Sequence, residues 1–212
     1  MIIKLYKYVS MNNYFSDLLE YGIYAAKLSE LNDPYEMIDI NETENYRIVS
    51  LSKSWNKKIL WAYYTGGHGC CVELKIDVPN DNSLLLKKVA YDKLSVFQEV
   101  RRKQGITESL FHKDKKFFEE NETRVIFDCS NPNQRYWTIL DDGRVFLKAK
   151  ISTVFFSPSA QFALSQYNKI IKLIKEYNKR IENHNDKIVI KKMRVHDQKY
   201  LFVIDRVIND EE

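Results

Sequence analysis

The chain has 212 residues and a formal net charge of +4, and 44% of its residues are hydrophobic, which is enough for a packed core. Glycine and proline are scarce, at 6 and 4 residues, which excludes collagen-like, linker-like and broadly disordered chains. No glycine-rich loop of the Rossmann or Walker type occurs in the sequence, so a nucleotide would have to be bound by another kind of site.

In the first half of the chain, alternating apolar residues indicate strands, and apolar spacings of three and four indicate helices. Asn12 or Asn13 can cap the first helix, and Gly22 can follow its last turn. The segment 31–36 reads L-N-D-P-Y-E and is typical of a turn, because the residue before a proline avoids the helical region. The expected helices run from this cap to about residue 21 and from 55 to 64, and the expected strands are 2–8, 23–27, 46–52, 70–76 and 83–91.

In the second half, strands and helices follow one another without a strict βαβ rhythm. This favours an α+β fold in which small split sheets, antiparallel or mixed, are flanked by helices. The sequence shows no linker and no internal repeat, so we expect a single domain over residues 1–212. The expected helices are 93–104, 107–118 and 160–183, and the expected strands are 121–129, 144–156, 187–195 and 200–207.

The long helix expected near the C-terminus is amphipathic. Its apolar face favours packing on a sheet, with a coiled-coil or dimer seam as the alternative, so the oligomeric state stays open. The other face carries Lys169, Lys172, Lys175 and Lys179, which form either a solvated face or a stripe that contacts phosphates. The apolar residues recur at spacings of four and three and are Ala163, Tyr167, Ile170, Ile174, Tyr177 and Ile181.

The sequence predicts neither a membrane span nor a metal site. No apolar stretch approaches the roughly 20 residues that span a bilayer. Near Met1, Lys4 and Lys7 interrupt the apolar residues, so this segment does not resemble the apolar core of a signal peptide. The histidines are scattered, and the three cysteines, Cys70, Cys71 and Cys129, lack the spacing of metal ligands. We therefore expect a cytoplasmic protein with buried reduced thiols, no structural metal and no membrane partner.

The segment 117–127, F-F-E-E-N-E-T-R-V-I-F, is the strongest candidate for chemistry. If a strand begins near Glu120, the side chains of Glu120, Glu122 and Arg124 share one of its faces. Two carboxylates on one face repel each other unless a ligand or a cation joins them, and Arg124 can itself supply that cation in a structural ion-pair cluster. A glutamate beside like charge and an apolar wall can also have a raised pKa, and then serve as a base or orient a ribose hydroxyl.

Two other segments carry residues that suit a nucleotide. Ser50 and Ser52 share one face of the strand 46–52, where hydroxyls can bind ribose or amide groups. Trp61 and Tyr64 are one helical turn apart. Their rings can sandwich a flat group such as nicotinamide, or else pack in the core.

The first strand adds a further candidate group in the motif L-Y-K-Y at 5–8. Tyr6 and Tyr8 share one face of this strand, and Lys7 lies on the other face beside Leu5. A lysine on the inner side of a strand needs an anion, which the protein or a ligand can supply. Tyr6 and Lys7 therefore join the candidate nucleotide-binding residues, together with Arg124.

Six short motifs occur in a fixed order. They are L-Y-K-Y at 5–8, L-N-D-P-Y-E at 31–36, S-L-S at 50–52, W-A-Y-Y at 61–64, H-G at 68–69 before a strand, and E-x-E-x-R at 120–124. Together they resemble a bacterial family known as domain of unknown function 2971, and V-F-F-S-P at 154–158 also fits its outline. One departure is Phe117, since the family usually has a tryptophan three residues before the first glutamate.

The layout is also similar to the ADP-ribosyltransferase fold, which binds NAD without a glycine-rich loop. This resemblance implies that Glu122 is the catalytic glutamate, which polarises a ribose hydroxyl and stabilises an oxocarbenium-like transition state, and that Glu120 faces the acceptor. Lys7 would grip the nucleotide at the position where that fold has a His or an Arg. A lysine lacks the fork of an arginine and the two-sided hydrogen bonding of a histidine, so Lys7 is a departure from the pattern.

The same resemblance assigns Ser50 and Ser52 to the nicotinamide ribose, and Tyr64 or Tyr63 to stacking on nicotinamide. It implies an enzyme that uses NAD as a substrate and transfers ADP-ribose to a protein or a nucleic acid, for example as a toxin or defence effector. One alternative is a non-catalytic module that binds a nucleotide or nucleic acid. Another is a nuclease, which would need the acidic residues near Glu122 to hold a metal.

Overall fold

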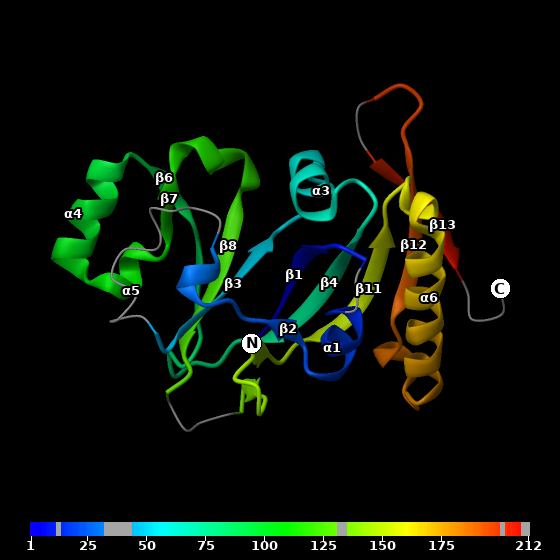
Figure 1. Cartoon of the computed structure of the whole chain (residues 1–212), viewed down its shortest axis with the longest axis horizontal. Coiled ribbons are helices and arrows are strands. Elements are labelled where there is room, and N and C mark those ends of the chain that lie inside the picture. The colour runs from blue at the N-terminus through cyan, green and yellow to red at the C-terminus, as the bar shows by residue number, and fades with distance from the viewer. Residues whose placement is uncertain (12–13, 32–43, 131–134, 200–201, 209–212) are drawn as a thin grey trace. The chain divides into compact units, whose positions relative to one another are not determined.

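The computed structural model describes residues 1–11, 14–31, 44–130, 135–199 and 202–208 (Figure 1). The chain is a mixed α+β protein that divides into two compact units, each built from separate stretches of sequence. Unit 1 comprises Met1, Ile23–Lys53 and Asp77–Lys148, and unit 2 comprises Ile2–Gly22, Ser54–Ile76 and Ala149–Glu212. The expectation of one domain over residues 1–212 stays a prediction.

Among its described residues, unit 2 contains five neighbouring strands in the order β13-β12-β11-β4-β1. Strand β11 pairs antiparallel with β4 and parallel with β12, and β12 pairs antiparallel with β13. The strands are rich in β-branched and aromatic residues, which pack well on a pleated surface. Their bounds are Ile2–Val9 (β1), Cys70–Asp77 (β4), Lys150–Phe156 (β11), Val189–Val195 (β12) and Phe202–Ile208 (β13).

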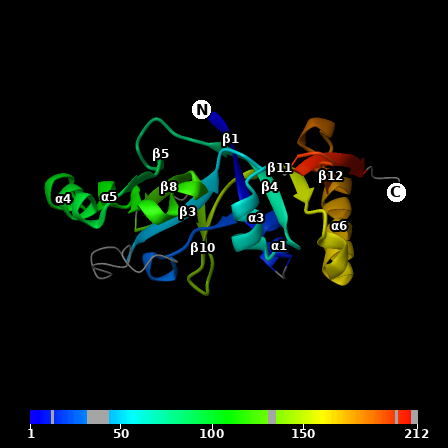
Figure 2. The ribbon, with the colours of Figure 1, turned by 90° about the horizontal axis from the view of Figure 1, so that it is seen from above.

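The longest helix of unit 2 is α6, Leu164–Lys179, which lies along β12 in both views (Figures 1 and 2). It buries Ile170 and Ile174, and its Tyr167 ring meets Phe156 of β11 edge to face at 4.8 Å. This agrees with one amphipathic helix packed on a sheet. The other helices of unit 2 are α1 (Tyr14–Glu20), α3 (Lys58–Thr65), η4 (Ala160–Ala163) and η5 (His184–Asp186).

In the described part of unit 1, the strands form three small groups. In the first group, β8 lies between β3 and β5 and pairs antiparallel with both. In the second, β10 pairs antiparallel with β2 and β9, and in the third, β6 and β7 are parallel. The bounds are Ile23–Tyr24 (β2), Tyr46–Ser52 (β3), Leu85–Lys88 (β5), Ala90–Asp92 (β6), His112–Asp114 (β7), Glu122–Asp128 (β8), Trp137–Ile139 (β9) and Val145–Leu147 (β10).

Of the helices in the described part of unit 1, α4 is the longest, with 11 residues. Helix α4 packs against α5 and β7, and the 3-10 helix η3 packs against β6 and β7. Their bounds are Leu28–Glu30 (η1), Leu94–Gln104 (α4), Ile106–Ser109 (α5) and Lys115–Glu120 (η3).

Each unit has its own hydrophobic cluster. The cluster in unit 2 is largely aromatic and consists of Tyr8, Leu60, Trp61, Cys71, Phe155 and Met193. The cluster in unit 1 is mostly aliphatic and has fewer aromatic rings than the cluster in unit 2. It consists of Leu28, Ile48, Leu110, Phe111 and Ile126.

Several predicted elements agree with the structure, and the strand at 46–52 matches β3 at both ends. The helix expected at 107–118 is wrong. Helix α5 stops at Ser109, and the chain continues as strand β7 and the 3-10 helix η3. Gly105, with a φ of +89°, separates α4 from α5. After α5, Asp114 caps η3 by accepting a hydrogen bond from the Lys116 amide.

Other boundaries also differ. The strand expected at 83–91 is two strands, β5 and β6, and the strand expected at 144–156 is β10 and β11, while β9 was not predicted. The helix expected at 55–64 begins only at Lys58, because Ser54 and Trp55 form a hydrogen-bonded turn before it. The helix expected at 160–183 is η4 followed by α6, which ends at Lys179. The predicted Asn12 or Asn13 cap and most of the predicted turn at 31–36 lie outside the described residues.

In the part of the chain that the structure describes, no helix is long and apolar enough to cross a bilayer. All three cysteines are free. Cys70 and Cys71 are fully buried, as predicted, whereas Cys129 is only partly buried, so the prediction of a buried thiol is wrong at that position.

Candidate functional site

The candidate site lies in unit 1, where β3 and β8 pair. Their register places Ser52 opposite Glu122 and Ser50 opposite Arg124. Glu122 and Arg124 are two residues apart on β8, so their side chains leave the same face of the strand. The predicted shared strand face of Glu122 and Arg124 is therefore confirmed.

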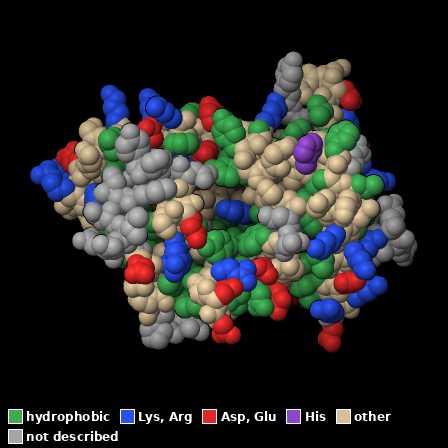
Figure 3. All heavy atoms as spheres, viewed as in Figure 1, with side chains coloured by type: hydrophobic (Ala, Val, Ile, Leu, Met, Phe, Trp, Pro, Cys, Tyr) green, Lys and Arg blue, Asp and Glu red, His purple; other side chains and the backbone are tan. Residues whose placement is uncertain are grey.

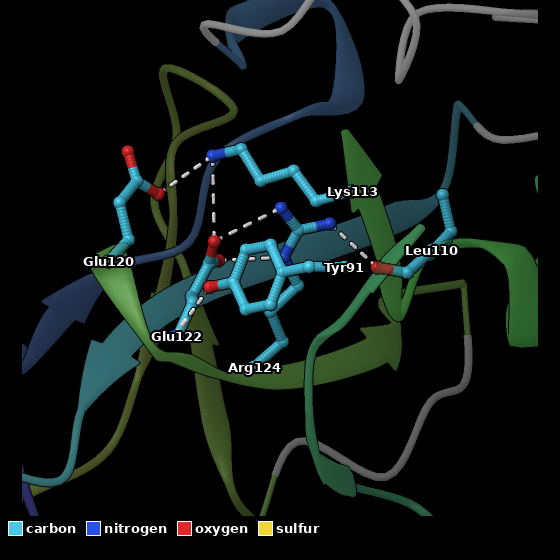
Figure 4. Close-up of polar contacts among 6 residues, drawn as sticks. All are labelled: Tyr91, Leu110, Lys113, Glu120, Glu122 and Arg124. Atoms are coloured by element: carbon cyan, nitrogen blue, oxygen red, sulfur yellow. Dashed lines mark hydrogen bonds and ion pairs between the residues drawn. The ribbon is translucent and has the colours of Figure 1, made fainter. Parts of the chain in front are cut away.

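Arg124 holds Glu122 with two of its nitrogen atoms. Its Nε lies 2.6 Å from Glu122 Oε1, and its Nη2 lies 3.3 Å from Oε2. Its Nη1 donates to the backbone carbonyl of Leu110 at 2.6 Å. The Arg124 side chain is only 1% exposed and that of Glu122 only 5%, so this is a buried, two-point ion pair (Figure 4).

Lys113 of β7 is a second cation in the same cluster (Figure 4). Its Nζ donates to Glu120 Oε2 at 2.9 Å and lies 3.6 Å from Glu122 Oε2. It also lies 4.5 Å from the centre of the Phe117 ring. Two carboxylates and two cations thus balance each other inside unit 1, which is what keeps such groups charged when they are buried.

Tyr91 of β6 also contacts Glu122, through the backbone amide of that residue. Its hydroxyl accepts a hydrogen bond from the Glu122 amide at 2.7 Å. Burial and the nearby carboxylate of Glu122 raise the pKa of this hydroxyl, so it stays protonated at neutral pH. Tyr91 thereby fixes the start of β8, where Glu122 is the first residue.

The electrostatic environment lowers the pKa of Glu122 to about 2. Burial alone would raise this pKa, but the Arg124 charge and hydrogen bonds, the Lys113 charge and a hydrogen bond from the Ser50 hydroxyl together outweigh it. Of the two possibilities that the sequence left open, the pKa of Glu122 therefore follows the ion-pair cluster and not the raised value. At neutral pH, Glu122 is an anion that accepts hydrogen bonds and stabilises positive charge, rather than a base that titrates near pH 7.

Glu120 does not lie where the sequence predicted. It is the last residue of η3, and Asn121, in the left-handed conformation with a φ of +46°, separates it from β8. The expected shared strand face therefore holds for Glu122 and Arg124 but is wrong for Glu120. The buried carboxylate of Glu120 reaches the cluster through Lys113 instead.

Lys113 and Tyr91 were not predicted. Lys113 stands in the run H-K-D-K-K, where the sequence alone does not show which lysine turns inward. Tyr91 and Lys113 meet because β6 and β7 are parallel and place them side by side. The one available signal is the carboxylate pair itself, because two buried acids need more than one cation.

The remaining candidate residues lie in unit 2. The Tyr6 hydroxyl donates to Glu73 Oε2 at 3.0 Å, and burial with this carboxylate raises the Tyr6 pKa to about 12. Trp61 is buried between Tyr8 and Phe202, and its N–H donates to the Trp55 carbonyl at 2.9 Å. Protein therefore covers the Trp61 ring, which gives it a packing role rather than an open stacking face.

Tyr64 and Lys7 are both half-buried in unit 2. Tyr64 packs against the aromatic cluster of that unit, next to Trp61. Lys7 lies on β1 between Tyr6 and Tyr8. The nucleotide-binding roles of Tyr6, Lys7 and Tyr64 stay predictions.

Within the described residues, no group of three or more His, Cys, Asp or Glu side chains is arranged to hold a metal ion. Comparisons with protein-family models, with curated proteins and with solved structures find no match for this chain. The resemblances drawn from the short motifs therefore stay predictions, and the geometry around Glu122 carries the functional argument.

Proposed function

We propose that this protein is an ADP-ribosyltransferase-like enzyme of the domain-of-unknown-function 2971 kind, which cleaves NAD and transfers ADP-ribose to a protein or nucleic-acid acceptor. One observation carries the proposal. The β3–β8 pairing brings the Ser50 hydroxyl to the Glu122 carboxylate, and two cations keep that carboxylate ionised. These are the serine and the glutamate that the motif resemblance assigns to the nicotinamide ribose and to catalysis.

The proposed reaction uses Glu122 as a fixed anion. The bond between C1′ of the ribose and the nicotinamide nitrogen breaks, and its electron pair leaves with neutral nicotinamide. The positive charge that develops on the ribose is stabilised by the Glu122 carboxylate, which also accepts a hydrogen bond from a ribose hydroxyl. The acceptor then forms a bond to C1′ and releases its proton to solvent.

A ribose hydroxyl would reach Glu122 on the side of Oε2. Oε1 is held by Arg124 at 2.6 Å, whereas Oε2 makes longer contacts of 3.3 Å to Arg124 and 3.6 Å to Lys113. Lys113 can give up the 3.6 Å contact and keep its 2.9 Å contact with Glu120. Because the Glu122 side chain is only 5% exposed, the reaction requires the cluster to open at this carboxylate before a ribose can reach it.

The test is release of nicotinamide from NAD by the purified chain. We expect turnover in the wild type and a loss of at least about 100-fold in Glu122→Gln, the scale seen when an electrostatic stabiliser is removed. Ser50→Ala should lower the rate by a smaller factor while the fold is kept. Glu108→Gln is the matched control, because Glu108 is a partly exposed glutamate of unit 1 whose partner is Lys87, and its rate should not change.

A second candidate is a non-catalytic module that binds a nucleotide or nucleic acid. It is favoured by the balance of the cluster, in which two acids and two bases satisfy one another while buried. Such a protein would melt at a higher temperature with NAD but release no nicotinamide. If NAD neither raises the melting temperature nor is cleaved, both nucleotide functions are wrong.

A further inference from the structure

The positive charge of unit 1 is concentrated between β5 and η3. Residues 87–120, to the end of η3, carry nine Lys and Arg against six Asp and Glu, a net charge of +3. This segment forms β6, α4, α5, β7 and η3, which pack on one another. Figure 3 shows Lys and Arg side chains at α4 and near β6, interspersed with some Asp and Glu and with apolar side chains. Such a surface attracts an anionic partner.

Helix η3 presents an aromatic ring beside two of these cations. Phe118 is 60% exposed, although a phenylalanine gains most by burial. Lys115 and Lys116, three and two residues before it on the same short helix, are also exposed. An exposed ring flanked by lysines is the combination with which proteins hold single-stranded nucleic acid.

The Phe118 ring is held in place rather than loose. It packs edge to face on Tyr91 with 6.2 Å between ring centres. Helix η3 is capped at its start by Asp114, and at its end the Asn121 amide donates to the Phe118 carbonyl at 3.1 Å. A ring fixed in advance loses little entropy when a base stacks on it, which favours binding.

We infer that the face of η3 formed by Phe118, Lys115 and Lys116 binds single-stranded nucleic acid, with one base on the ring and phosphates at the lysines. An acidic peptide would use the lysines but would gain little from the ring. A duplex would keep its bases stacked and out of reach. The exposed Glu119 repels phosphate, so the strand runs on the lysine side of Phe118.

This inference goes beyond the proposed reaction, because the binding needs neither NAD nor Glu122. The probe is a short fluorescein-labelled oligothymidylate, and its anisotropy is measured without NAD over a series of salt concentrations. Phe118→Ala should weaken binding about tenfold, which is the loss expected for one stacked base. Lys115→Glu with Lys116→Glu should weaken it further and lower the salt slope by about 0.7 for each phosphate that the lysines no longer neutralise.

The matched control is Lys148→Glu with Lys150→Glu, which makes the same charge change on two exposed lysines outside both η3 and the lysine stripe of α6. It should change the affinity less than about twofold. Absence of binding, or equal losses in both double variants, would overturn the inference. Tighter binding of poly-glutamate than of the oligothymidylate would also overturn it. So would a duplex that binds with the same affinity as the oligothymidylate, if Phe118→Ala does not change the affinity for that duplex. Nicotinamide release is a separate measurement, so the proposed reaction and this inference can fail independently.

Discussion

The interiors of the two units are stabilised in different ways. Unit 2 buries an aromatic cluster that includes Tyr8, Trp61 and Phe155, and the rings of Tyr8 and Trp61 pack edge to face. Unit 1 buries Lys113, Glu120, Glu122 and Arg124 beside its smaller apolar cluster. Apolar burial is favourable by itself, whereas buried charges are stable only while every partner is present. The charged cluster should therefore be the more fragile of the two, and it is also the one that can carry chemistry.

The largest effect is expected from removal of one charge inside unit 1. Arg124→Met leaves the buried Glu122 carboxylate with the 3.6 Å contact to Lys113 and the Ser50 hydrogen bond but without its closest cation, and it removes the donor that Arg124 gives to the Leu110 carbonyl. We expect the free energy of unfolding in urea to fall by about 3 to 5 kcal/mol. The exposed pair of Arg144 and Asp142 is the matched comparison, and Arg144→Met should cost less than about 1 kcal/mol.

A double variant distinguishes the loss of the Glu122–Arg124 ion pair from the cost of leaving an unpaired carboxylate buried. If the loss in Arg124→Met comes from an unpaired buried carboxylate, then adding Glu122→Leu should restore much of the stability. Equal stability of Arg124→Met and the wild type would instead mean that the cluster is open to water. In that case the contrast between the two interiors is wrong.

The next effect is a pH dependence specific to Glu122. Its pKa in the folded protein, about 2, lies below the ordinary value of 4.5, so folding is favoured by the ionised form. This stability is fully present above the unfolded pKa and is lost as the pH falls from about 4.5 towards 2, with a size on the order of 3 kcal/mol. The difference in unfolding free energy between the wild type and Glu122→Gln should shrink over that range. A difference that stays constant down to about pH 2 would contradict the lowered pKa.

The same contrast explains what the sequence could predict. Strand β3 was predicted to the residue, and Glu122 with Arg124 follows from strand alternation, because these are local patterns. Lys113 could not be predicted, since its inward direction depends on β6 and β7 meeting in parallel. The direction of the Glu122 pKa stayed open for the same reason. Arg124 is the largest of the influences that lower this pKa, and Lys113 and Ser50 add to it only because the folded unit brings them to Glu122.

A smaller loss is expected from a hydroxyl in unit 2. Tyr8 donates to the Ser54 carbonyl at 2.8 Å and accepts from the Lys57 amide at 2.9 Å, which fixes the chain just before α3. Tyr8→Phe keeps the ring against Trp61 but leaves both backbone groups without this partner, so we expect a loss of about 1 to 3 kcal/mol. Tyr63→Phe is the control, because Tyr63 is 70% exposed on the same helix, and it should be neutral. Faster hydrogen exchange confined to the first turn of α3 would locate the effect in this contact.

The smallest effect concerns the thiols, and it compares the two units without disturbing either. Burial raises the pKa of Cys70 and Cys71 in unit 2, so in the folded protein they are poor nucleophiles that reagents do not reach. Cys129, in unit 1, is partly exposed just after β8. A disulfide reagent should therefore modify one thiol per chain quickly and the other two only on unfolding. The variant Cys129→Ser should abolish the fast phase, and its free energy of unfolding should fall by less than about 0.5 kcal/mol. Fast modification of all three thiols in the native protein would mean that the unit 2 core opens readily, and the apolar interior would then be the fragile one.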